Sequence, residues 1–160
     1  MAVQTNYSAA MATAYAGMIA STEPNELISR NVETAAGIGF AVPVIQGASD
    51  NGCDLVAAAS DAVIGITVRD QSVTGDKFAQ YDSALLMRKG PLWVTVTDAG
   101  GVAAGDEVWV KVADGTFSNA DAGGSGSIKL PGCRWETSAA NGELAQIRVN
   151  LDVPAEAGGA

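Results

Sequence analysis

Residues 145–153, which read AQIRVNLDV, decide the fold of this chain because polarity alternates at every position. The apolar members are Ala145, Ile147, Val149, Leu151 and Val153. Successive side chains of a strand point to opposite faces, so these residues share one face and the polar residues between them share the other. The two-residue period predicts an antiparallel strand with one face against a core and one face in water.

The same period recurs in three further stretches, at residues 64–69, 92–97 and 107–112. Asp114-Gly115 and Asn141-Gly142 separate runs of this kind and are typical of hairpin turns. Pro43 lies inside another apolar run, and because proline cannot donate to a ladder we expect an edge strand there. Short strands at this spacing predict an all-β protein, either an antiparallel β-barrel or a jelly-roll-like sandwich.

The first segment differs, because it is rich in alanine and carries a helical period. Ser8 is a suitable helix cap, and Pro24 and Asn25 would end the helix. Its apolar face, spaced i, i+4, i+7 and i+8, consists of Met11, Tyr15, Met18 and Ile19. A helix this short is marginal in water, so it must pack on something else. We therefore divide the chain into an N-terminal helical or extended arm at 1–26, a β-barrel domain at 27–153 and a flexible tail at 154–160.

Composition limits the function classes. The 160 residues are 48 % hydrophobic but only 6 % aromatic and include 19 glycines, which fits short strands and many turns. The formal net charge is −9, and among the nine basic residues only Arg88 and Lys89 are adjacent. A nucleic-acid groove needs a basic stripe, so we expect no nucleic-acid partner. The apolar stretch at 9–20 is too short to span a membrane, and no Lys or Arg precedes it as in a signal peptide.

Catalytic and metal chemistry lacks its usual residues. The chain has no histidine, which removes the commonest general base and transition-metal ligand. Asp106 and Glu107 are neighbours on a predicted strand, so they point to opposite faces and cannot flank one bond. We interpret Cys53 and Cys133 as unpaired thiols in a reducing cytosol, although their spacing alone leaves a disulfide open. The prediction is a protein that is no enzyme and needs no cofactor or metal.

Tryptophans are the remaining functional candidates. Trp93 and Trp109 lie opposite the aliphatic rows of their strands, so we expect them half-exposed or facing a second layer. They would cover the barrel or an oligomer seam, or form a platform on which sugars stack. Both interpretations stay open from the sequence.

Four stretches, in this order along the chain, resemble the structural cement (head decoration) proteins of tailed bacteriophages. They are YAGMIASTEPNELISR at 15–30, RKGPLWV at 88–94, AGDEVWV at 104–110 and GCRWETS at 132–138. The resemblance covers most of the chain, and no single piece is a catalytic signature. It implies a structural virion protein on the outer surface of an icosahedral capsid, made in the host cytoplasm, that cements contacts between capsomers.

The resemblance also implies the partner, which is the major capsid protein, and points to Ile28, Arg30 and Arg88 as assembly contacts. Self-association is expected as well, with a homodimer favoured over a trimer. The full set of candidate capsid or oligomer contacts is Met11, Tyr15, Met18, Ile19, Asn25, Ile28, Arg30, Arg88, Trp93 and Trp109. The alternative is a carbohydrate-binding β-barrel module on a phage or cell surface, which would not need the N-terminal arm.

Overall fold

The computed structural model of the chain describes residues 14–123, 126–153 and 156–157. No α-helix occurs in these ranges, and the predicted all-β class is confirmed. None of the described residues belongs to a helix with the length and apolarity to cross a membrane. In chain order the strands are β1 (Glu26–Val32), β2 (Ile38–Gly39), β3 (Pro43–Gln46), β4 (Gly52–Leu55), β5 (Val63–Thr67), β6 (Lys77–Phe78), β7 (Ser83–Thr95), β8 (Glu107–Lys111), β9 (Thr116–Ser118), β10 (Ser127–Trp135), β11 (Leu144–Asn150) and β12 (Glu156–Ala157).

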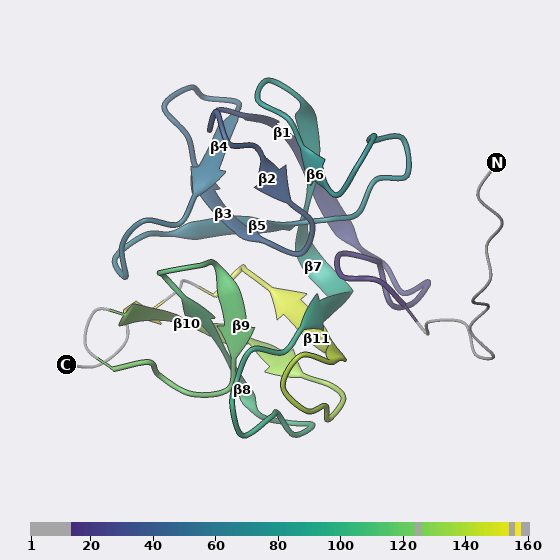
Figure 1. Cartoon of the computed structure of the whole chain (residues 1–160), viewed down its shortest axis with the longest axis vertical. Helices are drawn as coiled ribbons and strands as arrows, with labels where there is room; N and C mark the ends of the chain where they lie inside the picture. Colours follow the sequence, from purple (N-terminus) through teal and green to yellow (C-terminus); the bar gives the residue numbers. More distant parts are fainter. Residues whose placement is uncertain (1–13, 124–125, 154–155, 158–160) are drawn as a thin grey trace, which may run out of the picture.

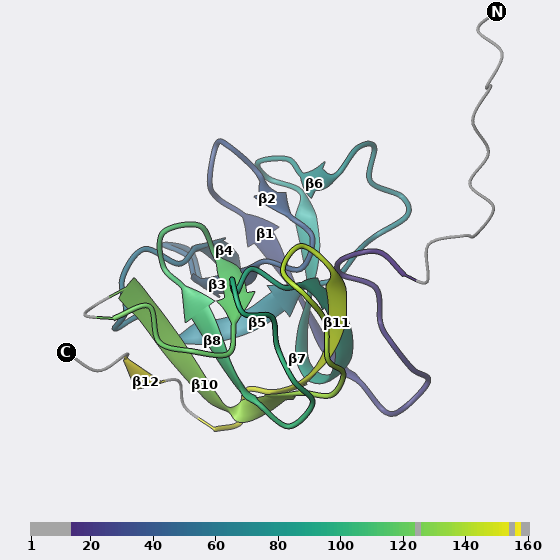
Figure 2. The ribbon, with the colours of Figure 1, turned by 60° about the horizontal axis from the view of Figure 1, so that its bottom comes forward.

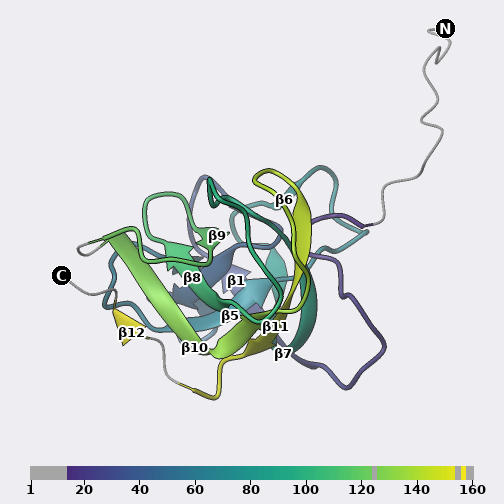
Figure 3. The ribbon, with the colours of Figure 1, turned by 90° about the horizontal axis from the view of Figure 1, so that it is seen from below.

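The strands close into two rings that share β7 (Figure 1). In the first ring the hydrogen-bonded order is β1-β4-β3-β5-β7, and β7 pairs back onto β1. In the second ring the order is β7-β11-β10-β8-β9, and a bridge from Phe117 to Val96, directly after β7, closes it. Seen from below, the second ring lies in front of the first (Figure 3). The predicted barrel is thus built as two small barrels on one common strand.

β7 serves both rings because it is 13 residues long. Its first half lies between β1 and β5, and its second half pairs with β11 from Lys89 to Thr95. Gly90 stands where β1 gives way to β11, with a φ of 133°. A Cβ at this position would collide with the side chain of Asn25, so glycine is required both for the backbone angle and for the close approach.

Each ring encloses an apolar core. The first core consists of Val32, Ile38, Phe40, Val44, Cys53, Phe78, Ala84 and Leu86. The small β2–β6 sheet supplies Ile38 and Phe78, and the Phe78 ring packs edge-on against Phe40 at 5.2 Å between centroids. Ile66 of β5 and Met87 of β7 belong instead to the cluster that fills the second ring. Each fully buried aliphatic or aromatic side chain contributes about 1.5–3 kcal/mol, so this shared packing fixes the two rings together.

The alternating rows are confirmed where one face of a strand is in the core. Ala145, Ile147 and Val149 of β11 are fully buried, as are Val108 and Val110 of β8. The row ends earlier than its sequence pattern, because β11 stops at Asn150 and Val153 is exposed. Figure 2 shows the short strand β12 beside β10, with which it pairs.

Two expectations about the first ring are wrong. Pro43 does not mark an edge strand, because β3 pairs with both β4 and β5. Proline is tolerated here as the first residue of the strand. In β5, Thr67 is buried rather than water-facing, since β5 lies between the two cores. Its hydroxyl donates to the carbonyl of Gly39 at 2.7 Å and accepts from the amide of Val42 at 2.8 Å, which satisfies it inside the protein.

The described part of the predicted N-terminal helix is not helical. Residues 14–20 form a turn and an isolated bridge, and Ile19 bridges Leu92 of β7. The amide of Gly17 donates to the carbonyl of Trp93 at 2.7 Å, and the amide of Trp93 donates to Met18 at 2.9 Å. A short alanine-rich helix would have to give up these backbone bonds, so pairing with β7 overrides local helix propensity. Ser8 and Met11 lie outside the described residues.

Candidate functional site

Three predicted contact residues of the N-terminal segment are described, namely Tyr15, Met18 and Ile19, and the segment that contains them pairs with β7. Tyr15 is 58 % exposed, and the guanidinium of Arg69 lies 5.5 Å from its ring centroid. The same guanidinium lies 4.5 Å from the ring of Phe40, and its Nε donates to the carbonyl of Ala16 at 3.1 Å. Tyr15 is therefore an exposed ring held in place by a cation, which is a suitable surface for a partner.

Met18 and Ile19 serve the fold more than the surface. The amide of Tyr15 donates to the Sδ of Met18 at 3.2 Å, and Ile19 packs against the core of the second ring. Both side chains are half-buried. Of the predicted apolar face, Met18 and Ile19 are thus turned towards the protein by the pairing with β7, whereas Tyr15 stays exposed.

Three predicted contact residues from distant parts of the sequence meet in one place. Ile28 and Arg30 of β1 and Arg88 of β7 line one cavity of about 300 Å³. We call this cavity the Arg30–Arg88 pocket, and its complete lining is Ile28, Arg30, Val63, Ile64, Arg88 and Leu151. The side chains meet because β1 and β7 are antiparallel, with Ile28 opposite Leu86 and Arg30 opposite Ala84. The lining contains two guanidinium groups, four aliphatic side chains and no carboxylate.

The two arginines differ in how their charges are met. Arg88 donates from Nη1 to Glu26 at 3.2 Å, and both side chains are partly exposed, which makes this a weak surface ion pair. Arg30 donates from Nη1 only to the carbonyl of its neighbour Ser29, at 3.0 Å. Its Nε is buried without a hydrogen-bond partner, and it forms no ion pair with any described residue. Arg30 therefore keeps unused hydrogen-bonding capacity inside the pocket.

Asn25, which precedes β1, has a buried and unsatisfied Oδ1 beside Gly90. Together with Arg30 Nε it completes the set of buried side-chain polar atoms that lack a partner in the described part of the chain. Both atoms thus belong to residues at or within β1. Native proteins satisfy nearly all such groups, so two exceptions in the short stretch from Asn25 to Arg30 distinguish this stretch from the rest of the described chain.

β1 also has an open edge, which we define as residues 27–30. β1 pairs with β4 only at Asn31 and Val32, whereas β7 pairs along its other side. No described strand covers the remaining edge. Leu27 and Ser29 are exposed there. Apart from the carbonyl of Ser29, which accepts from Arg30 Nη1, such an edge presents unpaired backbone donors and acceptors to any extended segment that approaches it.

The tryptophans do not form a common surface. Trp93 and Trp109 are half-buried on β7 and β8, which are not neighbours in the second ring. The ammonium of Lys129 lies 5.6 Å from the ring of Trp109. Trp135 is buried, and its indole Nε1 donates to the carbonyl of Ser118 at 3.3 Å. The structure therefore gives the sugar-stacking interpretation no shared aromatic platform.

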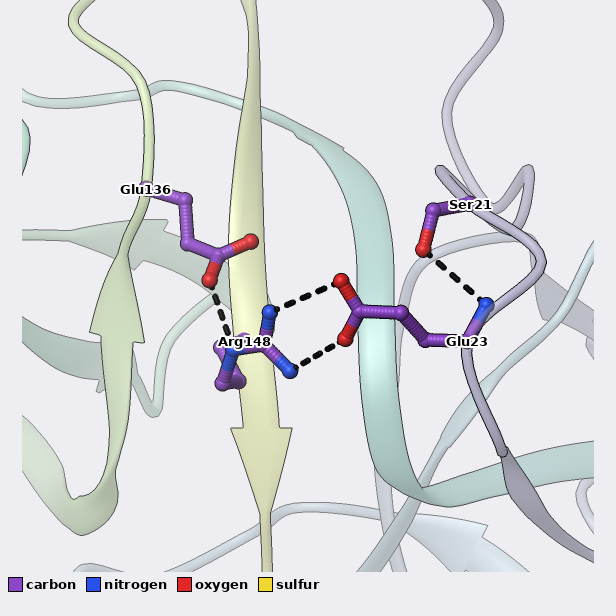
Figure 4. Close-up of polar contacts among 4 residues, drawn as sticks. All are labelled: Ser21, Glu23, Glu136 and Arg148. Atoms are coloured by element: carbon purple, nitrogen blue, oxygen red, sulfur yellow. Dashed lines mark hydrogen bonds and ion pairs between the residues drawn. The ribbon is translucent and has the colours of Figure 1, made fainter.

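An ion-pair clamp that the sequence did not reveal holds the segment before β1 (Figure 4). Arg148 of β11 donates from Nη1 and Nη2 to both oxygens of Glu23, at 2.7 and 3.3 Å. Its Nε donates to Glu136 at 2.6 Å. The hydrogen bond from Arg148 lowers the pKa of Glu23, and the two carboxylates raise the pKa of Arg148. No local pattern could show this clamp, because 125 residues separate Glu23 from Arg148.

Other acidic residues close turns. Glu33 accepts from the amides of Ala48 and Ser49, at 2.6 and 2.8 Å. The side chain of Ser49, followed by these two amides, lowers the pKa of Glu33. Asp106, which directly precedes β8, accepts from Asn119 at 2.7 Å and from the amide of Ala103 at 2.9 Å. Within the described ranges, no three acidic or cysteine side chains come together as metal ligands. These carboxylates therefore serve the loops.

Both cysteines are free and buried, which confirms their interpretation as unpaired thiols. Cys53 lies in the core of the first ring and Cys133 in that of the second. Burial raises the pKa of each thiol to about 11. A thiol with so high a pKa carries little thiolate near neutral pH, so neither cysteine is a nucleophile.

Comparisons with known proteins give a family match and similar solved structures. The family model described as "Structural cement protein (E217 gp24/Pam3 gp6)" matches residues 3–150. The fold is similar to a chain in the solved structure "The capsid of Myoviridae Phage XM1", with a TM-score of 0.75 and 21 % identity over 94 % of this chain and 98 % of that one. A chain of "The crystal structure of head fiber gp8.5 N base in bacteriophage phi29" matches at a TM-score of 0.42 and 11 % identity, over 80 % of this chain and 96 % of that one. No curated protein matches the chain.

Proposed function

Because this chain belongs to the phage structural cement protein family, we propose that it binds the outside of an icosahedral capsid and stabilises contacts between capsomers of the major capsid protein. The observation that carries the proposal is the family match over residues 3–150, which spans both rings. The solved relative with the same fold comes from a phage capsid. The proposal assigns no catalytic role to any residue.

Charge supports the outer surface as the location. A net charge of −9 would be repelled by packaged DNA, whereas outside the shell it favours solubility. Two free, buried thiols are compatible with synthesis in the reducing cytoplasm of the host. The charge concerns where the bound protein lies, and the thiols concern where it is made. Neither identifies the contact between capsomers that it covers.

The proposed contact surface follows the segment from residue 14 to β1. Tyr15 presents an exposed ring, and the Arg30–Arg88 pocket and the open edge of β1 present charge and backbone groups. A cement protein needs area on two capsomers at once, and an added surface across a seam stabilises the shell in proportion to its differential binding to the assembled state. We propose Met11 as a further contact, because the family match includes it.

We propose a homodimer as the bound form, with a trimer as the alternative. The loss of Pro43 as an edge marker removes one reason for this proposal. The remaining reasons are the half-buried Trp93 and Trp109 opposite the core rows and the exposed large apolar residues, which are Tyr15, Leu27, Leu55, Tyr81 and Val153. Light scattering at tens of micromolar checks it, and a strict monomer that also occupies the capsid as single copies would contradict it.

The test of the function is reconstitution. Purified protein is mixed with capsid shells that lack it, and occupancy is measured by cryo-electron microscopy together with the melting temperature of the shells. We expect ordered density on the outer surface and a higher shell melting temperature. Absence of binding by the folded full-length protein, or binding only inside the shell, would overturn the proposal.

A truncation locates the part of the arm that matters. Deleting residues 2–13 keeps the strand-like pairing of Gly17 and Met18 with Trp93, so the barrel should fold and melt as the full-length protein does. We expect this variant to lose most of its capsid occupancy. Deleting residues 2–20 is not an equivalent test, because it also removes the pairing with β7. Equal occupancy of the 2–13 deletion and the full-length protein would show that these residues are not contacts.

A further inference from the structure

We infer that the Arg30–Arg88 pocket accepts a carboxylate side chain of the major capsid protein, carried by an extended segment that adds to the open edge of β1. The inference rests on the proposed function and specifies the chemistry of its partner. Three observations of this chain carry it: a guanidinium whose Nε lacks a partner, a pocket without a carboxylate, and an edge without a neighbouring strand.

The guanidinium of Arg30 is the first observation. A buried polar group without a partner is unfavourable, and more so when it carries charge. Arg30 Nε is in this position, and Arg30 Nη1 reaches no further than the carbonyl of Ser29. A carboxylate in the pocket would accept from the guanidinium with two oxygens, which is the geometry that arginine is best suited to bind.

The composition of the pocket is the second observation. Its lining contains Arg30 and Arg88 with aliphatic walls from Val63, Ile64 and Leu151, and no acidic residue. Glu26 takes only one recorded hydrogen bond from Arg88 and leaves the other donors of that guanidinium for a second acceptor. A volume of about 300 Å³ leaves room for an entering side chain.

The position of the edge is the third observation. An extended segment that pairs with residues 27–30 places the side chain opposite Arg30 on the same face as Arg30, because directly opposite residues of two strands share a face. Arg30 shares its face with Ala84, which is in the first core, and it lines the pocket. Strand addition therefore aims every second side chain of the partner at the guanidinium groups, while backbone bonds supply affinity.

The chain itself is acidic, so its interaction with another acidic surface would be repulsive outside this pocket. The pocket thus offers a local positive site in a protein of net charge −9. Such an arrangement fixes register, because a partner bound one residue out of place would lose the charge pair and turn its side chain to the other face.

The experiment compares three variants in binding to capsid shells that lack the protein. Arg30→Met keeps the aliphatic stem and removes the guanidinium, Arg30→Lys keeps the charge without the planar fork, and Arg134→Met removes an exposed charge outside the pocket. We expect Arg30→Met to weaken binding by about 30-fold or more, the effect of removing one partner of a buried charge pair. Arg30→Lys should weaken it less, and Arg134→Met should bind as the wild type does.

The free protein supplies a second readout. Because Arg30 Nε is buried without a partner before binding, Arg30→Met should melt at the same temperature as the wild type or higher. Amide exchange of Leu27 and Ser29 should slow in the bound wild type, as strand addition requires. Equal binding of Arg30→Met and wild type, equal weakening by Arg30→Met and Arg134→Met, or a lower melting temperature of Arg30→Met would each overturn the inference. The inference would also be overturned if Arg30→Met lost self-association and kept its binding to capsid shells. Failure of the wild type to bind shells would instead count against the proposed function.

Discussion

The second ring and the β1 side of the first ring differ in whether their buried polar side-chain atoms have hydrogen-bond partners. In the second ring the buried indole of Trp135 donates to Ser118, and the aliphatic rows around it are complete. At β1, Asn25 and Arg30 each keep a buried polar atom without a partner, and the neighbouring edge is open. The contrast indicates that stability is concentrated in the second ring and in the shared strand, whereas the β1 side retains unfavourable features that binding can relieve.

The largest expected effect concerns the second ring alone, where a matched tryptophan pair compares a buried with a half-buried indole. Trp135→Ala should lower the free energy of unfolding by about 3–5 kcal/mol, because it empties a fully buried site and removes the bond to Ser118. Trp109→Ala, at a half-buried position on β8, should cost about 1 kcal/mol. Urea denaturation followed by circular dichroism measures both. Equal losses at the two positions would show that burial in the core of the second ring adds nothing to the effect of removing an indole.

The strand between the two cores gives the next effect. Thr67→Val should destabilise by about 1–3 kcal/mol, because the carbonyl of Gly39 and the amide of Val42 would lose their buried partner. Thr95→Val, at an exposed position of β7, should change stability by less than about 0.5 kcal/mol. Thermal melts of both variants make the comparison. A neutral Thr67→Val would mean that water replaces the hydroxyl.

The two thiols compare the rings directly, since each core contains one. Changing both Cys53 and Cys133 to Ser should cost about 1–3 kcal/mol in total. Cys133 should contribute the smaller share, because its Sγ accepts from the amide of Asn150 at 3.4 Å and a hydroxyl can take over that bond. Single variants in urea separate the two shares. Reductant should leave the melting temperature of the wild type unchanged, and a fall of more than about ten degrees would indicate a disulfide in solution.

The clamp at Glu23 should give the smallest effect, confined to the segment before β1. Arg148 lowers the pKa of Glu23 from its ordinary 4.5, so the stabilisation is complete above that value and is lost as the pH falls through the lower folded pKa. Glu23→Gln should speed amide exchange at Gly17 and Ala20 at neutral pH without changing global stability. The control is Asp76→Asn, at an exposed position. Unchanged exchange in Glu23→Gln would mean that pairing with β7 holds this segment alone.

The sequence predicted those parts of the fold where one physical cause dominates. The row of Ala145, Ile147 and Val149 has a core on one side and water on the other, so its period is clean. The prediction that Thr67 faces water was wrong because β5 is covered on both faces, and an alternating pattern does not reveal the second covered face. The prediction of an edge strand at Pro43 was wrong because a proline that begins a strand lacks only a donor that the strand pairing does not need.

The candidate site was predictable only in pieces. Ile28, Arg30 and Arg88 could be named from family-like motifs, but the sequence does not show that they line one pocket, since β1 and β7 lie more than 50 residues apart. Helix propensity led to a wrong prediction for the segment around Met18, because the carbonyl of Met18 accepts from the amide of Trp93 instead of from a donor within a helix. These contacts depend on tertiary pairing, and a local pattern contains no information about them.

The shared strand β7 also sets an order of events during synthesis on the ribosome. Every strand of the first ring lies between Glu26 and Thr95, before β8 begins at Glu107. The first ring can therefore close while the rest of the chain is still being translated, with Ile66 and Met87 temporarily uncovered. The later strands then assemble on a β7 that is already in place, so the nascent chain is most exposed to aggregation in the interval between the emergence of Thr95 and that of β11.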